Sequence, residues 1–441
     1  MFARRIAVIG TGYVGLTTGA CLASLGHHVV CADIDAAKVA RLRAGQVDIL
    51  EPGLADLVEE GIAAGRLRFV VGASAAVTSA GRGGSSDTDL PAEIVYLCVP
   101  TPMGAGGAAD LAAVRAVADE VRDLLPPGCV VVNKSTVPVG TAATTLQILG
   151  RADVAVVSNP EFLREGSAVH DFLHPDRIVV GSASQEAAER VAALYARLGA
   201  PTLLTDAASA EMVKYAANCF LAMKLSFVNS LADLCERLGA DVVEVTEGMG
   251  HDRRIGQTFL SPGPGWGGSC FPKDTHALLQ IADAAGMDFD LVRASLAVNT
   301  KTRALVVDKI RTAVGGTLTG RRIGLLGLTF KAGTDDLRDS PALAVAHLLH
   351  TEGAELTGYD PAHQIGVPGT TDDITVVDDP LTVAKEADAL VVLTEWPQFR
   401  TLDWTAMAGV ATTPVVIDTR NLLDADILHR AGFTWIGVGR G

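Results

Sequence analysis

The pattern of apolar and polar residues predicts an α/β region from residue 4 to about residue 205. Short β-branched runs alternate there with Ala-rich helical stretches, which is typical of a parallel sheet. The expected strands are RIAVIG, HVVCAD, RFVVG, EIVYLCVP, CVVVNKS, VAVVSNP and RIVVG. Between the third and fourth strands, the polar and Gly/Ser-rich segment SAGRGGSSDTDLPAE predicts an exposed loop.

The pattern changes at Asp206. From there to Leu238 the chain has no Pro or Gly and is rich in helix formers, so we expect one long helix. Because this helix is apolar nearly all round, we expect it to be buried. Helical sequence continues to about Val314, apart from the Gly/Pro-rich loop LSPGPGWGGSCFPKD.

A second α/β pattern ends the chain. It starts at RRIGLLGLTF and recurs at ELTGYDP, ALVVLTEW and PVVIDTRN. Its first strand and turn, RIGLLGLTFKAG, loosely repeat RIAVIGTGYVG, but without the full set of glycines. The fold class is therefore α/β, with two parallel-sheet domains bridged by a helical region that contains one long buried helix. We expect boundaries at residues 1–205, 206–315 and 316–441.

Composition adds what the chain is not expected to bind. With 49% hydrophobic and 20% charged residues among 441, the balance is that of a globular protein. The formal net charge of -15 argues against a nucleic-acid surface and against an anionic membrane surface. No apolar run is long enough to span a membrane. The start, MFARRIAVIG, superficially resembles a signal peptide, but a glycine turn follows it at once, so a strand is the better interpretation.

The seven cysteines indicate a reducing compartment. They show no C-x-x-C and no metal-like spacing, and their number is odd. We therefore expect a cytoplasmic protein with no metal. Most of the cysteines lie in apolar sequence, where a buried and inert thiol is typical. Cys270 differs, because it lies in a polar, glycine-rich loop and is followed by a Lys-Asp pair.

A dinucleotide fingerprint follows the first strand. Gly10, Gly12 and Gly15 form G-x-G-x-x-G, in which the glycines allow a tight turn, close approach of a pyrophosphate, and close packing of helix on strand. Asp33 ends the second strand, where a carboxylate accepts hydrogen bonds from ribose hydroxyls and repels a 2'-phosphate. The pattern predicts a Rossmann-like domain that binds NAD rather than NADP. The alternative is a plain strand-turn-helix with an acidic strand end.

Cys270 suggests chemistry beyond a single hydride transfer. An aldehyde gives up a hydride readily only after a nucleophile adds to its carbonyl, and a thiolate does this by forming a thiohemiacetal that is oxidised to a thioester. Lys273 or loop amides would favour the thiolate. Taken alone, however, a loop cysteine is more often inert than reactive.

Other candidate residues lie on the long helix and after two strands. Lys214 and Asn218 are four apart on one helix face, where an ammonium could stabilise an alkoxide or simply extend to water at the helix edge. Glu161 and Glu165 could act as a base and a positioning group, or merely begin a solvated helix. His170 and His174 lack the H-E-x-x-H pattern of a metal site. Thr136 follows a strand, so its hydroxyl could face a ligand or stabilise a turn.

Together these residues resemble the UDP-glucose 6-dehydrogenase family, within the wider UDP-glucose/GDP-mannose dehydrogenases. The resemblance covers the whole chain. The motifs that carry it are GTGYVG, EPGL, CVPTP, KSTVPVGT, NPEFLREGSA, DFLHPDR, EMVKYAANCFLAMKLSFVNS, RIG, GWGGSCFPKD, FKAGTDDLRDSPAL and DTRN.

The resemblance implies a four-electron oxidation of UDP-glucose at C6 to UDP-glucuronate, consuming two NAD and one water. It implies an N-terminal NAD-binding domain, a central dimerisation region and a C-terminal UDP-sugar-binding domain. Cys270 matches the nucleophile, while Lys214 and Asp274 match residues that handle the alcohol proton and the oxyanion, with Asn218 holding them. Glu161 matches the acid-base residue of thioester hydrolysis, and Thr136 matches a hydroxyl that positions water.

Two sets of binding residues are implied in the same way. For NAD they are Gly10, Gly12, Tyr13, Val14, Gly15, Asp33, Lys38, Thr101, Ser135, Thr136, Glu165, Lys273 and Arg338. For the sugar nucleotide they are Glu161, Phe162, Leu163, Arg164, Glu165, Lys214, Asn218, Arg254, Ser261, Gly263, Gly265, Trp266, Gly267, Lys331 and Arg420. Arg254 matches an arginine contributed by a neighbouring subunit, so we expect a homodimer or a higher homo-oligomer.

One departure and two alternatives remain. The family more often has Phe or Tyr where this chain has Trp266, so the fit around the substrate could differ. The same chemistry could act on GDP-mannose or UDP-N-acetylmannosamine, although KSTVPVGT and RIG favour the UDP-glucose branch. A catalytically silent nucleotide-binding or scaffold protein is the other alternative, and the presence of Cys270, Lys214, Asp274 and Glu161 together argues against it.

Overall fold

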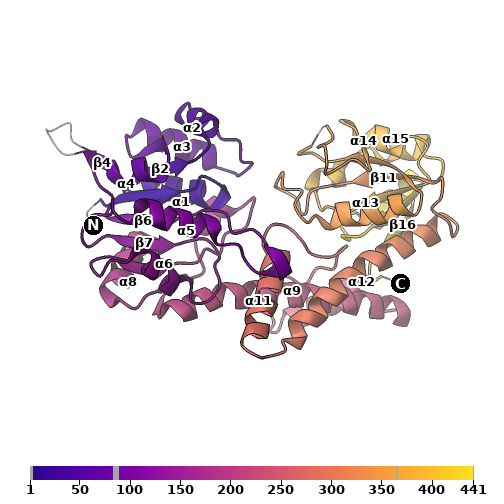
Figure 1. Ribbon diagram of the computed structural model, residues 1–441. Helices are drawn as coiled ribbons and strands as arrows, with labels where there is room; N and C mark the ends of the chain where they lie inside the picture. The colour runs from indigo at the N-terminus through magenta and orange to yellow at the C-terminus, as the bar shows by residue number, and fades with distance from the viewer. Residues whose placement is uncertain (1–2, 83–88, 364, 441) are drawn as a thin grey trace. The chain divides into compact units, whose positions relative to one another are not determined.

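The computed structural model describes residues 3–82, 89–363 and 365–440 (Figure 1). The backbone forms two compact units. The first comprises residues 1–217 together with 276–285, and the second comprises residues 218–275 together with 286–441. Each unit is built around one large sheet. The three-part division expected at residues 205 and 315 stays a prediction.

Eight of the described strands form the sheet of the first unit, in the order β10-β9-β8-β7-β6-β1-β2-β3. The strands are β1 (Arg5–Ile9), β2 (His28–Asp33), β3 (Leu67–Val71), β6 (Ile94–Leu97), β7 (Val130–Asn133), β8 (Ala155–Ser158), β9 (Ile178–Gly181) and β10 (Thr202–Thr205). Neighbouring strands are parallel except β8 and β9, which pair antiparallel at Ser158 and Gly181. The seven expected strands are confirmed. The sequence pattern did not predict β10, because TLLT is a short edge strand without a clear alternation of apolar and polar residues.

Helices cover both faces of this sheet. One face packs against α1 (Tyr13–Ser24), α2 (Ala36–Arg43), α3 (Leu54–Ala63), α7 (Ala168–Leu173) and α8 (Gln185–Ala192), and the other against α4 (Ala73–Thr78), α5 (Ala112–Val121) and α6 (Thr141–Leu149). A sheet covered on both sides needs apolar residues at every strand position, which explains the continuous runs in the sequence. The short 3-10 helices are η1 (Ala105–Gly107) and η2 (Ala193–Leu198).

The polar segment expected as an exposed loop lies between β3 and β6. Its flanks pair as a short antiparallel ribbon of β4 (Gly81–Arg82) and β5 (Asp89–Leu90). The rest of that segment, residues 83–88, lies outside the described residues.

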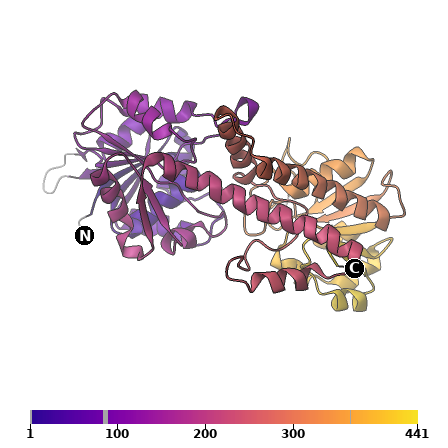
Figure 2. The same cartoon turned by 90° about the horizontal axis from the view of Figure 1, so that it is seen from below.

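The long helix is confirmed as α9 (Ala207–Leu238), which Figure 2 shows as one unbroken rod. It is followed by α10 (Val242–Gly250), α11 (Phe271–Ala284) and α12 (Asp290–Ala313). The expectation that α9 is buried needs correction over part of its surface. Tyr215, Ala222 and Val228 are fully buried, but Phe220 and Phe227 are each 56% exposed. The helix is apolar nearly all round in sequence, but one of its apolar faces is not covered by the rest of this single chain.

In the second unit, described strands form a parallel sheet in the order β13-β12-β11-β14-β15-β16. They are β11 (Arg322–Leu326), β12 (Glu355–Tyr359), β13 (Thr375–Val376), β14 (Ala389–Val392), β15 (Val415–Asp418) and β16 (Thr434–Gly437). The helices α12 and α13 (Pro341–Thr351) pack on one face. On the other face lie α14 (Pro380–Ala384), α15 (Trp404–Val410), α16 (Ala425–Ala431) and the 3-10 helix η3 (Pro397–Thr401).

The two sheets share a turn after their first strand, as the internal repeat predicts. The Gly10 amide donates to the carbonyl of Ala32 at 2.7 Å, and the Gly327 amide donates to the carbonyl of Tyr359 at 2.8 Å. An acidic residue ends the next strand in both cases. In the second unit this residue is Asp360, which is fully buried and accepts from the Leu328 amide at 2.7 Å and from the indole of Trp396 at 3.1 Å. Both of these bonds are to Oδ2, and Oδ1 accepts from the Ala362 amide at 2.9 Å. Because both oxygens of this buried carboxylate are hydrogen-bonded within the protein, neither is available to a ribose.

Within the described part of the chain, no helix has the length and apolar character needed to cross a bilayer.

Candidate active site

The glycine turn of the first unit is shaped to admit a ligand. Gly10 has a φ of +99°, and a Cβ there would come within 2.5 Å of the Cys98 carbonyl oxygen. A Cβ on Gly15 would lie 1.9 Å from the Gly10 carbonyl oxygen, so strand and helix touch at that point. Around Gly12, by contrast, no atom of any segment beyond its immediate chain neighbours lies within 4 Å of the Cβ position. The open position is the one at which a pyrophosphate approaches the amino end of α1, so these residues fit a dinucleotide.

Asp33 ends β2 beside this turn. Its carboxylate accepts from the Thr11 amide at 3.1 Å and the Thr11 hydroxyl at 2.5 Å, and Lys38 Nζ lies 3.5 Å away. Burial would raise the pKa of Asp33, but the hydrogen bonds from Thr11 and the Asp35 amide, with the Lys38 charge, outweigh it and lower that pKa. The carboxylate is therefore ionised at neutral pH. Thr11 was missed in the sequence, where it is only a variable position of the fingerprint.

Three hydroxyl residues follow β6 and β7 at the carboxyl edge of the sheet. The Thr101 hydroxyl donates to the Thr136 carbonyl at 2.9 Å, and the Ser135 hydroxyl donates to the Val99 carbonyl at 2.7 Å. These bonds join the two strand ends. Thr136 accordingly lies where ligands bind in such sheets.

Lys214 and Glu161 form a buried ion pair. Lys214 Nζ lies 2.7 Å from Glu161 Oε1, and the two side chains are only 4% and 5% exposed. The Leu163 amide donates to Glu161 Oε2 at 2.6 Å. Burial would raise the pKa of Glu161, but the Lys214 charge and hydrogen bond, with the Leu163 amide and the Lys134 charge, lower it. Glu161 follows β8 in irregular backbone, so the alternative of a solvated helix start is wrong.

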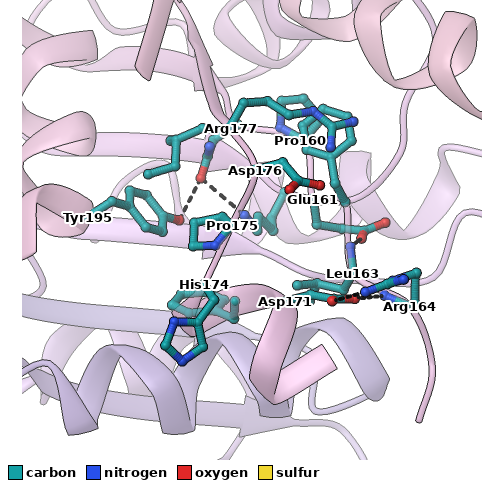
Figure 3. A pocket seen from close by; sticks show the side chains of 15 residues that line it. Pro160, Glu161, Leu163, Arg164, Asp171, His174, Pro175, Asp176, Arg177 and Tyr195 are labelled. Carbon is teal, nitrogen blue, oxygen red and sulfur yellow. Dashed lines mark hydrogen bonds and ion pairs between the residues drawn. The ribbon is translucent and has the colours of Figure 1, made fainter. Parts of the chain in front are cut away.

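The segment after β8 also lines a cavity of about 70 Å³ (Figure 3). Phe162 packs against Arg177, whose guanidinium carbon lies 3.6 Å from the ring centroid. On another side of the cavity, Lys134 donates to Asn159 Oδ1 at 3.3 Å, and the Tyr195 hydroxyl donates to the same oxygen at 2.7 Å. Lys134, Asn159 and Arg177 were not among the predicted site residues, although all three lie inside the family motifs KSTVPVGT, NPEFLREGSA and DFLHPDR.

Arg164 and Glu165 continue this segment. Arg164 is held by Asp171, with Nη2 2.6 Å from Oδ1 (Figure 3), and its side chain is 59% exposed. The Arg164 carbonyl and the Gly166 amide both face the Tyr13 hydroxyl, at 3.1 and 2.9 Å. Tyr13 and this segment, which the sequence assigns to cofactor and substrate respectively, therefore touch.

A second polar cluster lies at the start of α11, next to Cys270, in the second unit. Of the seven cysteines, all of them described, six are buried and Cys270 is half-buried. It directly precedes Phe271, the first residue of α11, and the Asp274 amide donates to its carbonyl at 2.9 Å. The amino end of a helix stabilises a negative charge placed there. This position adds a feature that the loop sequence did not reveal, because the helix start was not marked by a cap signal.

Asp274 is fully buried between two donors. Asn218 Nδ2 donates to Asp274 Oδ2 at 2.6 Å, and Lys273 Nζ donates to Oδ1 at 2.5 Å. The first contact agrees with the expected role of Asn218 in holding the carboxylate. Lys273 was expected to face NAD, and here its ammonium is committed to its sequence neighbour.

The glycines of the loop before Cys270 allow close approach of other protein segments. A Cβ on Gly263 would lie 2.7 Å from an Arg420 nitrogen, and one on Gly267 would lie 1.9 Å from the Asp339 carbonyl oxygen. Gly265 has a φ of +116°, which disfavours other residues. The structure thus brings Arg420 to the loop, and their common role in substrate binding stays a prediction. Ser261 is exposed at the loop surface.

Trp266 anchors this loop from within. It is 3% exposed, and its indole donates to the Ser226 hydroxyl of α9 at 2.8 Å. Its amide donates to Asn299 Oδ1 at 2.8 Å, and Asn299 Nδ2 donates back to the Trp266 carbonyl at 2.9 Å. The indole and the backbone of Trp266 thus form hydrogen bonds within the protein. These bonds explain the presence of Trp at this position without a contact to the sugar.

Three predicted cationic residues lie at the surface or beside rings. Arg338 pairs with Asp336 and Arg254 pairs with Asp252, with side chains 67% and 89% exposed. Lys331 Nζ lies 5.6 Å from the centroid of the Phe330 ring. No group of His, Cys, Asp and Glu suited to hold a metal ion occurs among the described residues, and His170 and His174 only stack, with ring centroids 4.9 Å apart.

Comparison with known proteins extends over nearly the whole chain. Models of the UDP-glucose/GDP-mannose dehydrogenase family match its NAD binding domain at residues 4–199, its central domain at 208–301 and its UDP binding domain at 324–425. The UDP-glucose 6-dehydrogenase of Rhizobium meliloti is 44% identical over 446 residues, covering 99% of each chain.

Two solved structures share the fold. A UDP-glucose dehydrogenase from Pyrobaculum islandicum has a TM-score of 0.88 at 36% identity, covering 100% of this chain and 98% of that one. A UDP-D-ManNAc dehydrogenase from Pyrococcus horikoshii has a TM-score of 0.85 at 28% identity, covering 99% of each. The expected fold and NAD cofactor are confirmed. The chain therefore belongs to the UDP-glucose/GDP-mannose dehydrogenase family and is an NAD-dependent oxidoreductase.

Proposed function

We propose that the chain oxidises UDP-glucose at C6 to UDP-glucuronate, with Cys270 as the covalent nucleophile. The observation that carries the proposal is the position of Cys270, the one half-buried cysteine, at the amino end of α11 beside the Asn218–Asp274–Lys273 cluster. The relative from Rhizobium meliloti, which carries the name of this activity, aligns over the same length.

The first oxidation removes a proton and a hydride from the C6 alcohol. The buried Lys214 ammonium would stabilise the developing alkoxide electrostatically, because it is held in place by Glu161 in a water-poor environment. NAD held at the glycine turn of Gly10, Gly12 and Gly15 would supply the hydride acceptor. Asp274, held by Asn218, would take part in moving the alcohol proton.

The second oxidation needs the thiolate. Cys270 Sγ forms a bond to the aldehyde carbon, and the carbonyl oxygen takes a proton to give a thiohemiacetal. Loss of that proton, and transfer of the remaining C6 hydride to the acceptor that a second NAD would supply, leaves a thioester on Cys270. Water then adds to the thioester carbon, the C–S bond breaks, and the acid and the free thiol are released. Ionised Glu161 would accept the proton of this water, which Thr136 would help to position.

The leading rival is the same chemistry on UDP-N-acetylmannosamine or GDP-mannose. One observation supports this alternative. The Pyrococcus horikoshii structure, which is named as a UDP-D-ManNAc dehydrogenase, shares the fold over 99% of both chains. A panel of sugar nucleotides, each assayed with NAD and with NADP, decides between them. A kcat/KM that is highest for another sugar nucleotide would contradict the proposal that UDP-glucose is the substrate.

The stoichiometry tests the thioester route. Purified protein should form two NADH for each UDP-glucose consumed, because the aldehyde stays on Cys270 until it is oxidised again. The measurement combines absorbance of NADH with chromatography of the sugar nucleotides. One NADH per sugar with release of the aldehyde would contradict the route.

The matched variant for this assay is Cys270→Ser. A hydroxyl is a much weaker nucleophile than a thiolate at neutral pH, so conversion of supplied aldehyde to acid should fall below detection. The control Cys235→Ser, at a buried cysteine, should retain the reaction. A normal yield of glucuronate from Cys270→Ser would remove Cys270 from its role.

We further propose that the protein is a homodimer in which Arg254 of one subunit contributes to the active site of the other. We also propose that the protein is located in the cytoplasm. The support for the homodimer is an exposed apolar stripe on α9 at a spacing of seven residues, formed by Phe220, Phe227 and Leu234. Arg254 itself is 89% exposed, which leaves its guanidinium accessible to a second chain. The seven free cysteines agree with a reducing compartment.

A further inference from the structure

Glu51 is a buried carboxylate to which the mechanism gives no role. It belongs to the EPGL motif before α3 and is only 7% exposed. Its Oε2 accepts from the Gly166 amide at 2.8 Å, and its Oε1 accepts from the Val169 amide at 3.2 Å. Burying a carboxylate costs free energy unless hydrogen bonds compensate for lost water. Glu51 is thus committed to the backbone that leads into α7.

Its remaining partner is a residue of the dinucleotide turn. The Tyr13 hydroxyl, one residue after Gly12, donates to Glu51 Oε2. Burial, and next the hydrogen bond to Glu51, raise the pKa of the Tyr13 hydroxyl well above its usual value. Tyr13 therefore remains a protonated donor throughout the physiological range. The same hydroxyl accepts from the Gly166 amide at 2.9 Å.

The segment held in this way is the one that carries the candidate substrate contacts. Glu161 to Glu165 lie in irregular backbone between β8 and α7, and Gly166 closes that stretch with a φ of +80°. Irregular backbone depends on side-chain hydrogen bonds for its shape, because it has no ladder of its own. Glu51 and Tyr13 supply three such contacts at its carboxyl end, all within the first unit.

We propose that Glu51 is a positioning residue that couples dinucleotide binding at the glycine turn to the conformation of the sugar-nucleotide segment at residues 161–166. The coupling passes through Tyr13, which contacts both. It rests on the proposed function, because it takes UDP-glucose as the second ligand. Such a coupling is reciprocal, so each ligand tightens the binding of the other by the same factor.

The test is calorimetric titration of the full-length chain with UDP-glucose, alone and in saturating NADH, which occupies the turn without oxidising the sugar. The wild-type chain should bind UDP-glucose roughly five-fold or more tightly with NADH present. In Glu51→Gln this ratio should fall close to one, because the amide nitrogen cannot accept from a backbone N–H. Tyr13→Phe removes the other half of the link and should show the same loss. The exposed Glu60→Gln on α3 is the matched control and should keep the wild-type ratio.

A wild-type ratio retained in both Glu51→Gln and Tyr13→Phe would overturn the coupling and leave the proposed function standing. A ratio of one in the wild-type chain would overturn it as well. A wild-type chain that binds NADH but no UDP-glucose would instead overturn the proposed substrate, and the coupling with it. Should Glu51→Gln melt too low to titrate, Tyr13→Phe decides alone.

Discussion

Glu161 shows how a single residue acquires its properties from neighbours that the sequence does not reveal. Its charge is compensated by Lys214, which lies 53 positions later in the chain and 2.7 Å away in space. Burial and the ion pair act on its pKa in opposite directions, and the pair prevails. Because the folded-state pKa is lowered, Glu161 contributes stability that is present above its unfolded pKa and lost as the pH falls through the folded value.

Replacing Lys214 by Met tests this balance through thermal melting between pH 5 and 7.5. Removing one partner of a buried pair leaves an uncompensated charge, which costs about 3–5 kcal/mol, or on the order of 10 °C in the melting temperature. The loss should be largest at pH 7 and shrink toward pH 5, because Glu161 in the variant regains a proton as the pH falls. The double variant Glu161→Gln/Lys214→Met should melt higher than Lys214→Met at pH 7. If the difference in melting temperature between the wild type and Lys214→Met did not change with pH, the loss could not be attributed to ionised Glu161.

The loop from Leu260 to Cys270 shows how the segments packed around a loop determine which residues it needs. Its glycines looked suited to a ligand, and the structure shows that Gly263, Gly267 and Gly268 are also required where other segments approach. The indole of Trp266 points inward and donates to Ser226 of α9, while the Trp266 backbone amide donates to Asn299 of α12. The hydrogen bond from the indole to Ser226 thus gives Trp266 a structural role in this loop.

Replacing Trp266 by Phe should loosen this loop without changing which sugar nucleotide is preferred. Loss of one buried hydrogen bond costs about 1 kcal/mol, which would raise the KM for UDP-glucose roughly five-fold. Because Ser226→Ala removes the same contact, the two changes should combine less than additively in a double-mutant cycle. The measurement is kcat and KM for the sugar-nucleotide panel. A switch in preference among the sugars would show that the indole contacts the substrate.

For the molecule as a whole, α9 presents an apolar face that the single chain does not cover. Phe220, Phe227 and Leu234 recur every seven residues and are at least 50% exposed. Seven residues bring a helix back to nearly the same face, so these side chains form one stripe. A stripe of this kind is typical of a helix that packs against another helix.

Complementation between inactive variants tests the proposed dimer. Arg254→Ala lacks the arginine given to a neighbour, and Cys270→Ser lacks the nucleophile, so each should be inactive alone. Co-expressed at equal amounts, they should recover about a quarter of wild-type activity, because half of the dimers contain one intact site. Adding Phe227→Glu to both chains should abolish recovery and shift sedimentation to the monomer. Failure of the first pair to recover activity would place Arg254 in its own subunit's site.

Much of the fold followed from local patterns. The strand runs, the glycine turn after β1 and the unbroken helix formers of α9 all predicted elements that the structure contains. These features depend on residues close together in sequence, for which periodicity and helix propensity are sufficient. The edge strands β10, β13 and β16 were missed because short strands with mixed exposure carry a weak pattern.

The sequence alone determined the family, the NAD fingerprint and the identity of the nucleophilic candidate, because each rests on residue types at fixed spacings. The tertiary structure decided which polar side chains meet: Glu161 with Lys214, Lys273 with Asp274, and Glu51 with the Tyr13 hydroxyl. It also decided that Trp266 points inward and that part of α9 faces outward. Pairing and burial depend on how distant segments pack, and no local spacing carries that information.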